Sequence, residues 1–504
     1  MRAVVVGAGV GGLATAVRLA HAGHSVVVLE QGDSTGGKCG RVVRDGFTWD
    51  SGPSLLTMPW VFEELFAATG APLADELELL RVEPVTEYRF ADGSSVAISA
   101  DLPVALEALE AWSPGSGADW VRFLGLCGSM WRASVPFLTG PPPWPPRRPV
   151  AGDPRPDPRD LLAVKPWHTL RTLARGCIRD ARLRLVVERF ATYAGADPRR
   201  APAALAVAGY VEHAFGAWHP RGGIYELVLA LERRLAALGG ELRTGVAVEG
   251  LDVRDGRIRG VRTGAGPIAA DAVVTDVDEL TVRQWVQPEE RSLRNRAAAL
   301  AGQTRDRIRP PHGAGSFRIN WEHQPERSVS GFALMLGLRG RTPGLPHHTI
   351  CFPADYDAEF DDVFVHRRPV RDPTLYLSVP QATEGGEDEE WFVLVNAPAG
   401  VEHDWTVYED HVMDRLAARG LDPGDRLAAR ARRSPADLER ETGAVGGAIY
   451  GAAPHGRLGT MKRPGTRIRG VEGLWLVGGT VHPGGGLPLV TLGAASVARD
   501  IGPA

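Results

Sequence analysis

The chain has 504 residues, which is enough for two large domains or about three of average size. A hydrophobic content of 44% permits complete cores, and a net charge of −4 provides no basic surface of the kind that binds nucleic acid. The 4 cysteines lie far apart in no paired motif, which argues against a zinc or iron–sulfur site, gives no disulfide framework and predicts a reducing cytosol.

The first predicted element is a buried strand at 3–6, followed by a glycine-rich turn. Gly7, Gly9 and Gly12 have the spacing that allows a tight turn, close approach of a pyrophosphate to the backbone and close packing of a helix on a strand. The amphipathic stretch 11–21 is predicted to be that helix, whose N-terminal amides and dipole favour a bound anion. This pattern is typical of a dinucleotide site.

A second strand is predicted at 25–29, and it ends in Glu30. A carboxylate at this position accepts hydrogen bonds from the ribose hydroxyls of a dinucleotide. It also repels a 2′-phosphate, so we do not expect NADP here. Strand, helix, second strand and acid together make the dinucleotide interpretation much stronger than the glycine motif alone.

A glycine pair opens the next loop of the chain. Gly36 and Gly37 would let the loop cross over a bound cofactor, with Lys38 and Arg41 facing its phosphates or its ring. The alternative is a surface turn with unrelated charges.

The middle of the chain has a second run of regular elements. A helix is expected near 224–238, a strand at 241–246, a hairpin at 253–261 and another buried strand at 272–275. The last of these strands ends at Asp276.

Two further strands, at 331–338 and 391–395, are expected to belong to another sheet. His347 and His348 invite a metal interpretation, but adjacent residues of a strand point to opposite faces, so structural roles are favoured. We assign no metal ligand and no catalytic residue. The acidic run 384–390 is expected to be a solvated loop.

A second glycine-rich segment, 478–486, nearly closes the chain. It follows an apolar run typical of a buried strand and precedes a helix-like stretch. One nucleotide cofactor held by both ends of a chain indicates a bound flavin rather than an exchanging nicotinamide.

These elements in this order resemble FAD enzymes of the amine-oxidase and phytoene-desaturase type, and specifically their bacterial carotenoid desaturase branch. The matching motifs extend over nearly the whole chain, and the run His-Pro-Gly-Gly-Gly-Leu-Pro is the most specific of them. The segments that carry the resemblance are 36–38, 50–55, 218–223, 347–350 and 477–488.

The resemblance implies an α/β fold in which a discontinuous Rossmann-like domain binds FAD. Its pieces would be residues 1–100, 215–285 and 455–504. An inserted α+β substrate domain, which also associates with the membrane, would comprise 101–214 and 286–454.

The resemblance also implies which residues contact FAD. At Gly479 related flavoenzymes often have an acid or alanine, so contact there is expected from backbone amides. The amides at the start of the last helix are expected to face the N1/O2 edge of the flavin, where negative charge accumulates on reduction. The cofactor-binding residues expected are Gly7, Gly9, Gly12, Glu30, Gly37, Lys38, Gly52, Pro53, Val246, Gly479, Thr480, Gly485, Gly486 and Leu487.

The activity implied by the resemblance is FAD-dependent desaturation of an acyclic carotenoid by hydride transfer to flavin, in carotenoid biosynthesis. Three alternatives remain open at this point. They are a carotenoid isomerase or oxygenase on the same scaffold, an FAD amine oxidase with a small polar substrate, and a non-catalytic flavoprotein that escorts prenylated proteins.

A polyene substrate resides in the bilayer, yet no stretch approaches the roughly 20 apolar residues of a spanning helix. We therefore expect a cytoplasmic protein attached peripherally to the cytoplasmic membrane. Tryptophans cluster around a proline-rich stretch at 140–158, where they either pack the insert, the favoured interpretation, or dip into a bilayer surface. They are Trp112, Trp120, Trp131, Trp144 and Trp167.

Overall fold

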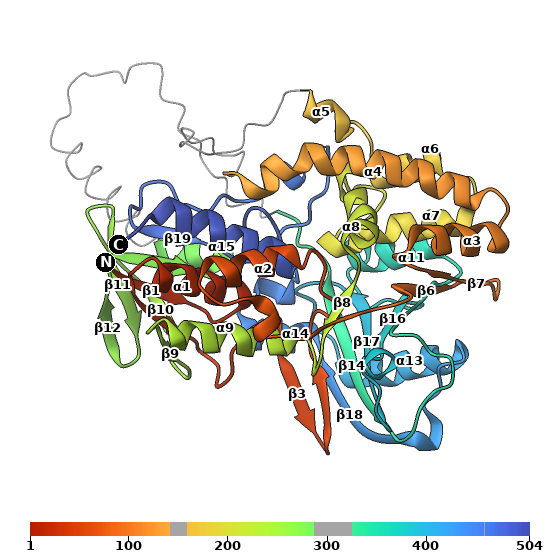
Figure 1. Ribbon diagram of the computed structural model, residues 1–504. Helices are drawn as coiled ribbons and strands as arrows, with labels where there is room; N and C mark the ends of the chain where they lie inside the picture. The colour runs from red at the N-terminus through yellow and green to blue at the C-terminus, as the bar shows by residue number, and fades with distance from the viewer. Residues whose placement is uncertain (142–158, 287–324, 458) are drawn as a thin grey trace, which may run out of the picture.

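The computed structural model describes residues 1–141, 159–286, 325–457 and 459–504. Two sheets, each with its own helices, form the two halves of the molecule, and both termini lie together at one edge (Figure 1). The backbone N–H of Ala504 donates to the carbonyl of Ala22, which holds the end of the chain beside the first helix.

The first half is built on a five-stranded parallel sheet. The central strands are buried at nearly every residue, as expected for a parallel sheet covered on both faces. In spatial order the strands are β19 (Leu474–Leu476), β13 (Ala272–Thr275), β1 (Arg2–Val6), β2 (Ser25–Leu29) and β9 (Glu241–Arg243).

The two faces of this sheet enter different cores because successive side chains of a strand alternate in direction. Val5 and Val28 point into a core shared with the helices, whereas Val4 and Val27 point into a core shared with a small antiparallel sheet. Burial of each such side chain stabilises the fold by about 1.5–3 kcal/mol. The helices are α1 (Val10–His21), α2 (Trp60–Ala68), α9 (Tyr225–Ala237) and α15 (Leu487–Ile501).

The small antiparallel sheet contains the predicted hairpin. Asp255 and Gly256 both have positive φ, as a tight two-residue hairpin turn requires. Its strands are β10 (Val248–Arg254), β11 (Arg257–Thr263) and β12 (Gly266–Ala269).

The second half is built on a seven-stranded mixed sheet. The antiparallel pair β14–β17 is its longest ladder. In spatial order the strands are β18 (Leu427–Arg433), β14 (Ser330–Leu338), β17 (Glu389–Ala397), β16 (Leu375–Ser378), β15 (His348–Cys351), β6 (Thr86–Arg89) and β7 (Ser95–Ile98). Since β6 and β7 come from the first 100 residues, the domain boundary predicted at residue 100 does not coincide with the boundary between the sheets.

Helices cover one side of this half and form a core of their own with β6, β7 and β15. The longest of them is α4, which contains Pro136 in its last turn. Among the described residues no helix is long and apolar enough to cross a membrane. The helices are α3 (Leu102–Trp112), α4 (Ser116–Thr139), α5 (Asp160–Ala163), α6 (Leu170–Cys177), α7 (Ala181–Arg189), α8 (Val207–Phe215) and α11 (Tyr356–Phe360).

The remaining elements pack against the seven-stranded sheet or join the two halves. Among them, α13 shares a core with β14, β16 and β17, while β4 shares another with β14 and β17. The strands among them pair as β3 with β4 and β5 with β8. They are β3 (Arg41–Arg44), β4 (Phe47–Asp50), β5 (Leu79–Arg81), β8 (Trp218–Pro220), α12 (Gln381–Glu384), α13 (Trp405–Ala418) and α14 (Pro435–Thr442).

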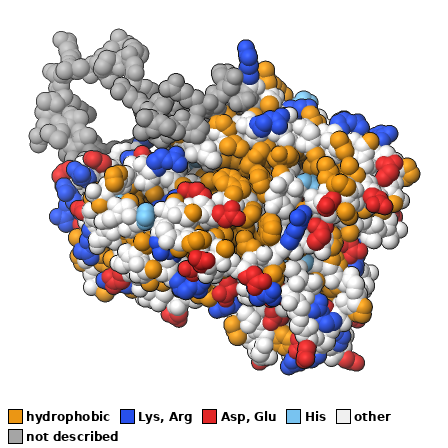
Figure 2. All heavy atoms as spheres, in the orientation of Figure 1, with side chains coloured by type: hydrophobic (Ala, Val, Ile, Leu, Met, Phe, Trp, Pro, Cys, Tyr) orange, Lys and Arg blue, Asp and Glu red, His pale blue; other side chains and the backbone are white. Residues whose placement is uncertain are grey.

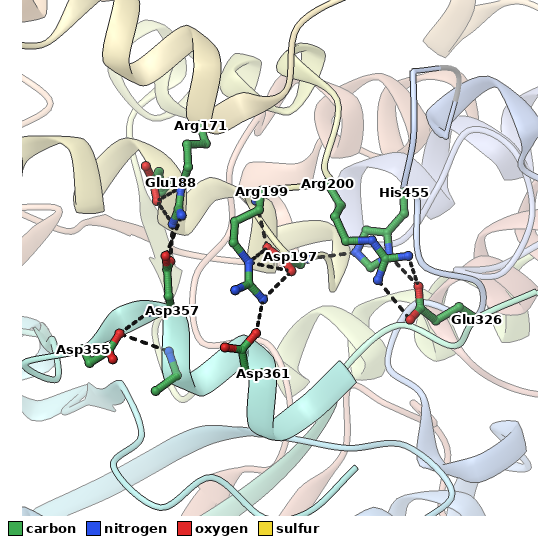
Figure 3. Close-up of polar contacts among 11 residues, drawn as sticks. Arg171, Glu188, Asp197, Arg199, Arg200, Glu326, Asp355, Asp357, Asp361 and His455 are labelled. Atoms are coloured by element: carbon green, nitrogen blue, oxygen red, sulfur yellow. Dashed lines mark hydrogen bonds and ion pairs between the residues drawn. The ribbon is translucent and has the colours of Figure 1, made fainter. Parts of the chain in front are cut away.

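Ion pairs connect the helices of the second half to one another and to neighbouring loops (Figure 3). Arg171 of α6 pairs with Glu188 of α7 at 2.6 Å and also with Asp357 of α11. The Arg171 guanidinium lowers the pKa of Asp357, so this pair stays ionised well below neutral pH. Arg200 and His455 share Glu326, with both distances at 2.7 Å. These contacts hold the helices in place and lie apart from the cavity described below.

The acidic run 384–390 is not a solvated loop throughout, so that expectation was wrong. Glu389 is fully buried in β17, accepts two hydrogen bonds from Thr342 and pairs with Arg426 at 2.9 Å. Glu384 bonds to His219 at 2.6 Å. The partners come from distant segments, which a local count of charges cannot reveal.

Candidate functional site

The carboxyl ends of β1, β2 and β13 open into a cavity of about 530 Å³. Residues of β14 and β17 line its opposite wall, so the cavity lies between the two large sheets. All of the predicted cofactor-binding residues except Gly12 line it. These are Gly7, Gly9, Glu30, Gly37, Lys38, Gly52, Pro53, Val246, Gly479, Thr480, Gly485, Gly486 and Leu487.

Gly12 lies behind the cavity wall, where it packs the first helix on the first strand. A Cβ atom at Gly12 would lie 2.2 Å from the carbonyl oxygen of Gly7. The Gly12 N–H donates to Oδ2 of Asp276 at 2.9 Å. Gly12 therefore sets the distance between α1 and β1, which is one of the roles that the motif predicts.

Glu30 lies at the end of β2, where it is buried and lines the cavity. Its Oε2 accepts from the N–H of Ala8 at 2.8 Å, and its Oε1 accepts from the N–H of Gly32 at 2.9 Å. These bonds fix the carboxylate beside the glycine loop. Its contact with a ribose stays a prediction.

The loop that carries Lys38 lines the cavity and is not a surface turn. The Lys38 ammonium donates to the carbonyls of Ala448 and Ile449 at 3.2 and 2.7 Å, so it joins the loop to a segment of the other half. Burial lowers the pKa of Lys38 to about 8, although Asp278 and Asp276 oppose that change.

The closing glycine segment reaches the cavity at the start of α15. Gly486, with φ +103°, is the residue before the helix, and α15 begins at Leu487 as predicted. The first N–H groups of any helix have no acceptor within it, so those of Leu487 and Leu489 can bind a group in the cavity, whereas Pro488 has no N–H. Gly485 packs against Tyr450, because a Cβ atom there would lie 2.5 Å from the ring. The hydroxyl oxygen of Thr480 accepts a hydrogen bond from the N–H of Glu279 at 3.2 Å.

The end of the cavity away from the glycine loop has a polar group that was not predicted as a site. Arg189, at the end of α7, is only 6% exposed. Its Nη1 donates to the hydroxyl of Tyr193 at 3.0 Å, and Tyr193 donates to Glu212 at 2.7 Å. The guanidinium carbon lies 5.5 Å from the ring centroid of Tyr376, a cation–π distance. Nothing in the sequence indicated that α7 would bring Arg189 against β16.

The walls near Arg189 are mainly apolar and aromatic. They come from β14, β17 and the segment after α14, and they would favour a hydrocarbon over a hydrated ligand. The side chains that form them include Val329, Ala333, Phe392, Leu394, Ile449 and Tyr450.

The two adjacent histidines lie outside this cavity lining and do not point to opposite faces. Their ring centroids are 4.4 Å apart, because His347 precedes β15 and strand alternation does not apply to it. His347 contacts Thr383 at 2.7 Å, and His348 contacts the carbonyl of Val85 at 3.0 Å. Burial lowers the pKa of both. In the described parts of the chain no group of three or more His, Cys, Asp or Glu residues is arranged to hold a metal ion.

Comparisons with known proteins agree with this geometry. Residues 10–278 match the family described as flavin containing amine oxidoreductase. The chain is 32% identical to the zeta-carotene-forming phytoene desaturase of Myxococcus xanthus, over 99% of this chain and 93% of the relative. It is 30% identical to the 4,4'-diapolycopene oxygenase of Methylomonas sp, over 99% and 97%. A solved structure of putrescine oxidase bound to putrescine covers 99% of this chain and 98% of its own, with a TM-score of 0.60 and 16% identity, which shows a shared fold.

Proposed function

We propose a function from the premise that the chain belongs to the flavin-containing amine oxidoreductase family and, within it, to the carotenoid desaturases. On that premise, the chain introduces double bonds into an acyclic carotenoid with FAD as cofactor. One observation supports this most directly. A single cavity is lined by the glycine loop of a dinucleotide site and by an apolar, aromatic wall. A long cofactor and a hydrocarbon substrate would meet there.

The residues of the cavity fit FAD. Gly7 and Gly9 line the cavity without side chains, as close approach of a pyrophosphate requires, and Glu30 lines it at the end of β2, where a ribose would lie. We therefore propose that the predicted residues that line the cavity hold FAD, with Gly12 supporting them from behind. When bound, FAD supplies a two-electron acceptor that takes a hydride equivalent from a substrate carbon.

The chain itself would orient the polyene and exclude water. The walls from β14 and β17 would hold the hydrocarbon by burial, at about 25 cal/mol per Å² of apolar surface. The free amides at the start of α15 would stabilise the negative charge that develops on the cofactor. Arg189 places a positive charge in the same cavity, held in a fixed orientation by Tyr193.

Expression of this chain in cells that make a colourless or yellow acyclic carotenoid should produce a pigment with a longer conjugated system. Chromatography of the extracted pigments, with and without the chain, would measure the change. An unchanged pigment profile would contradict the desaturase function.

A second function is favoured by the similarity to a 4,4'-diapolycopene oxygenase at 30% identity. In that case the new pigment should carry additional oxygen without a longer hydrocarbon chromophore. Mass spectrometry of the same extracts distinguishes the two functions.

We also propose that the chain binds a membrane surface through the region of α4 and α5, because the substrate resides in a bilayer. Figure 2 shows hydrophobic side chains gathered on the face that carries α4. Leu162 and Trp167 are each 61% exposed, and Val121 is 48% exposed. Trp120 is fully buried, so the packing interpretation applies to it. Trp144 and the proline-rich residues 142–158 lie outside the described residues.

Replacement of both Leu162 and Trp167 by Asp should reduce co-sedimentation with liposomes at least tenfold. Each removed side chain would otherwise bury apolar surface worth about 1.5–3 kcal/mol, and every 1.4 kcal/mol is tenfold. The matched control is Val407→Asp on α13, a side chain 64% exposed, which should sediment as the unmodified chain does. Equal loss in the control, or no loss in the double variant, would place the attachment elsewhere.

A further inference from the structure

A carboxyl group occupies the groove that the glycine motif opens. Asp276 directly follows β13, is half-buried and lines the cavity. A Cβ atom at Gly9 would lie 2.4 Å from its Oδ2, and one at Gly478 would lie 2.1 Å from its Oδ1. The Asp276 carboxyl thus rests against Gly9, the glycine that lets a pyrophosphate approach the backbone.

The groups around Asp276 act on its pKa in opposite directions, and those that raise it prevail. Burial is the main cause that raises the pKa of Asp276 to about 7, and the carboxylate of Glu30 adds to it. The N–H of Gly12 and the ammonium of Lys38 act in the opposite direction. Asp278, two residues on, is paired with Arg327 at 2.6 Å.

A pyrophosphate would bring further negative charge to this groove. Like charges disfavour ionisation, so the bound cofactor would raise the pKa of the Asp276 carboxyl further. A protonated carboxyl can donate one hydrogen bond and still accept the one from Gly12. An ionised carboxylate can only accept, and it would compete with the phosphates for the amides of the glycine loop.

We propose that Asp276 is a cofactor-binding residue that holds a proton in the complex and donates it in a hydrogen bond to the pyrophosphate of FAD. This inference rests on the FAD site of the proposed function. A proton is therefore taken up when FAD binds to the ionised protein, and the affinity falls as pH rises through the pKa of free Asp276. The proton comes from the solvent and forms the O–H bond of the carboxyl, and no other covalent bond changes.

The affinity of the apoprotein for FAD should fall about fourfold between pH 6 and pH 7.5, as expected for a single group with a pKa of about 7. Quenching of FAD fluorescence during titration with apoprotein measures it. The range stops at pH 7.5 because Lys38, with a pKa of about 8, still keeps most of its charge there and loses it at higher pH. In Asp276→Asn, which keeps the acceptor for Gly12, the affinity should not vary over this range.

The matched control is Asp271→Asn, which removes a carboxylate at the other end of the same strand, where it accepts from the N–H of Arg2 at 2.8 Å. It should keep the pH dependence of the unmodified chain. Asp276→Ser gives a second test should the Asn variant fail to fold, and it too should show no pH dependence.

A further readout needs no cofactor. The raised pKa means that ionised Asp276 destabilises the folded apoprotein near neutral pH, and the effect diminishes as pH falls toward the ordinary pKa of Asp, about 3.9. Asp276→Asn should therefore raise Tm more at pH 7.5 than at pH 5.

Two results would overturn this inference and leave the proposed function standing. They are FAD binding by the unmodified chain without pH dependence, and pH dependence that persists in Asp276→Asn. Failure of the unmodified chain to bind FAD at any pH would instead overturn the proposed function and, with it, this inference.

Discussion

Protein loaded with FAD should lose its flavin absorbance when an acyclic polyene is added in liposomes without oxygen. The polyene should absorb at longer wavelength at the same time, because each new double bond extends its conjugation. Both changes are expected in equal molar amounts, since one two-electron oxidation of the substrate reduces one flavin. Anaerobic stopped-flow or diode-array spectroscopy with phytoene and neurosporene measures them together.

The control for this experiment is an amine such as putrescine, the ligand of the oxidase with the same fold. The apolar, aromatic walls of this cavity favour a hydrocarbon over a hydrated diamine, so addition of the amine should leave the flavin oxidised. Bleaching by the amine and not by any polyene would show that the chain is an amine oxidase and contradict the proposed function.

Gly52→Ala should remove most of the bound flavin. A Cβ atom at Gly52 would lie 1.8 Å from the carbonyl oxygen of Lys38, which is backbone and cannot move aside as a side chain can. The loop that carries Lys38 would have to shift away from the cavity. Forced overpacking costs about 1–3 kcal/mol or more, so FAD affinity should fall by about 10- to 100-fold. Flavin released per mole of purified protein measures the loss.

Gly125→Ala is the matched control for that substitution. Gly125 lies within α4, and a Cβ atom there would meet nothing within 4 Å. Alanine favours a helix by about 0.5–1 kcal/mol over glycine, so stability should rise slightly and flavin content should not change. A full complement of flavin in Gly52→Ala would mean that the loop does not contact the cofactor.

Elements with local signals could be predicted well from the sequence. The apolar run at 3–6, its glycine turn and the amphipathic helix that follows are all encoded within about twenty residues, and α1 and β1 form there. The strand 272–275 was predicted with the bounds that β13 has, because every residue in it is apolar or β-branched.

Features that depend on distant segments could not be predicted in this way. Arg189 meets Tyr376 only because α7 and β16 pack together, and Lys38 finds its acceptors some 410 residues along the chain. The burial of Glu389 depends likewise on Arg426. For the same reason, the sequence could not show that β6 and β7 join the seven-stranded sheet, because short amphipathic strands have no local signal for the sheet they will join.

The order of strands in the parallel sheet has a consequence for biosynthesis. The sheet takes β1 and β2 from the first 30 residues, β13 from residues 272–275 and its edge strand β19 from residues 474–476. A nascent chain on the ribosome therefore cannot close the sheet, or add α15 beside α1, until almost all of it has been translated. Contacts over such separations are slow to form and leave apolar edges exposed meanwhile. Flavin uptake should thus occur late, after the last strand of the sheet has been translated.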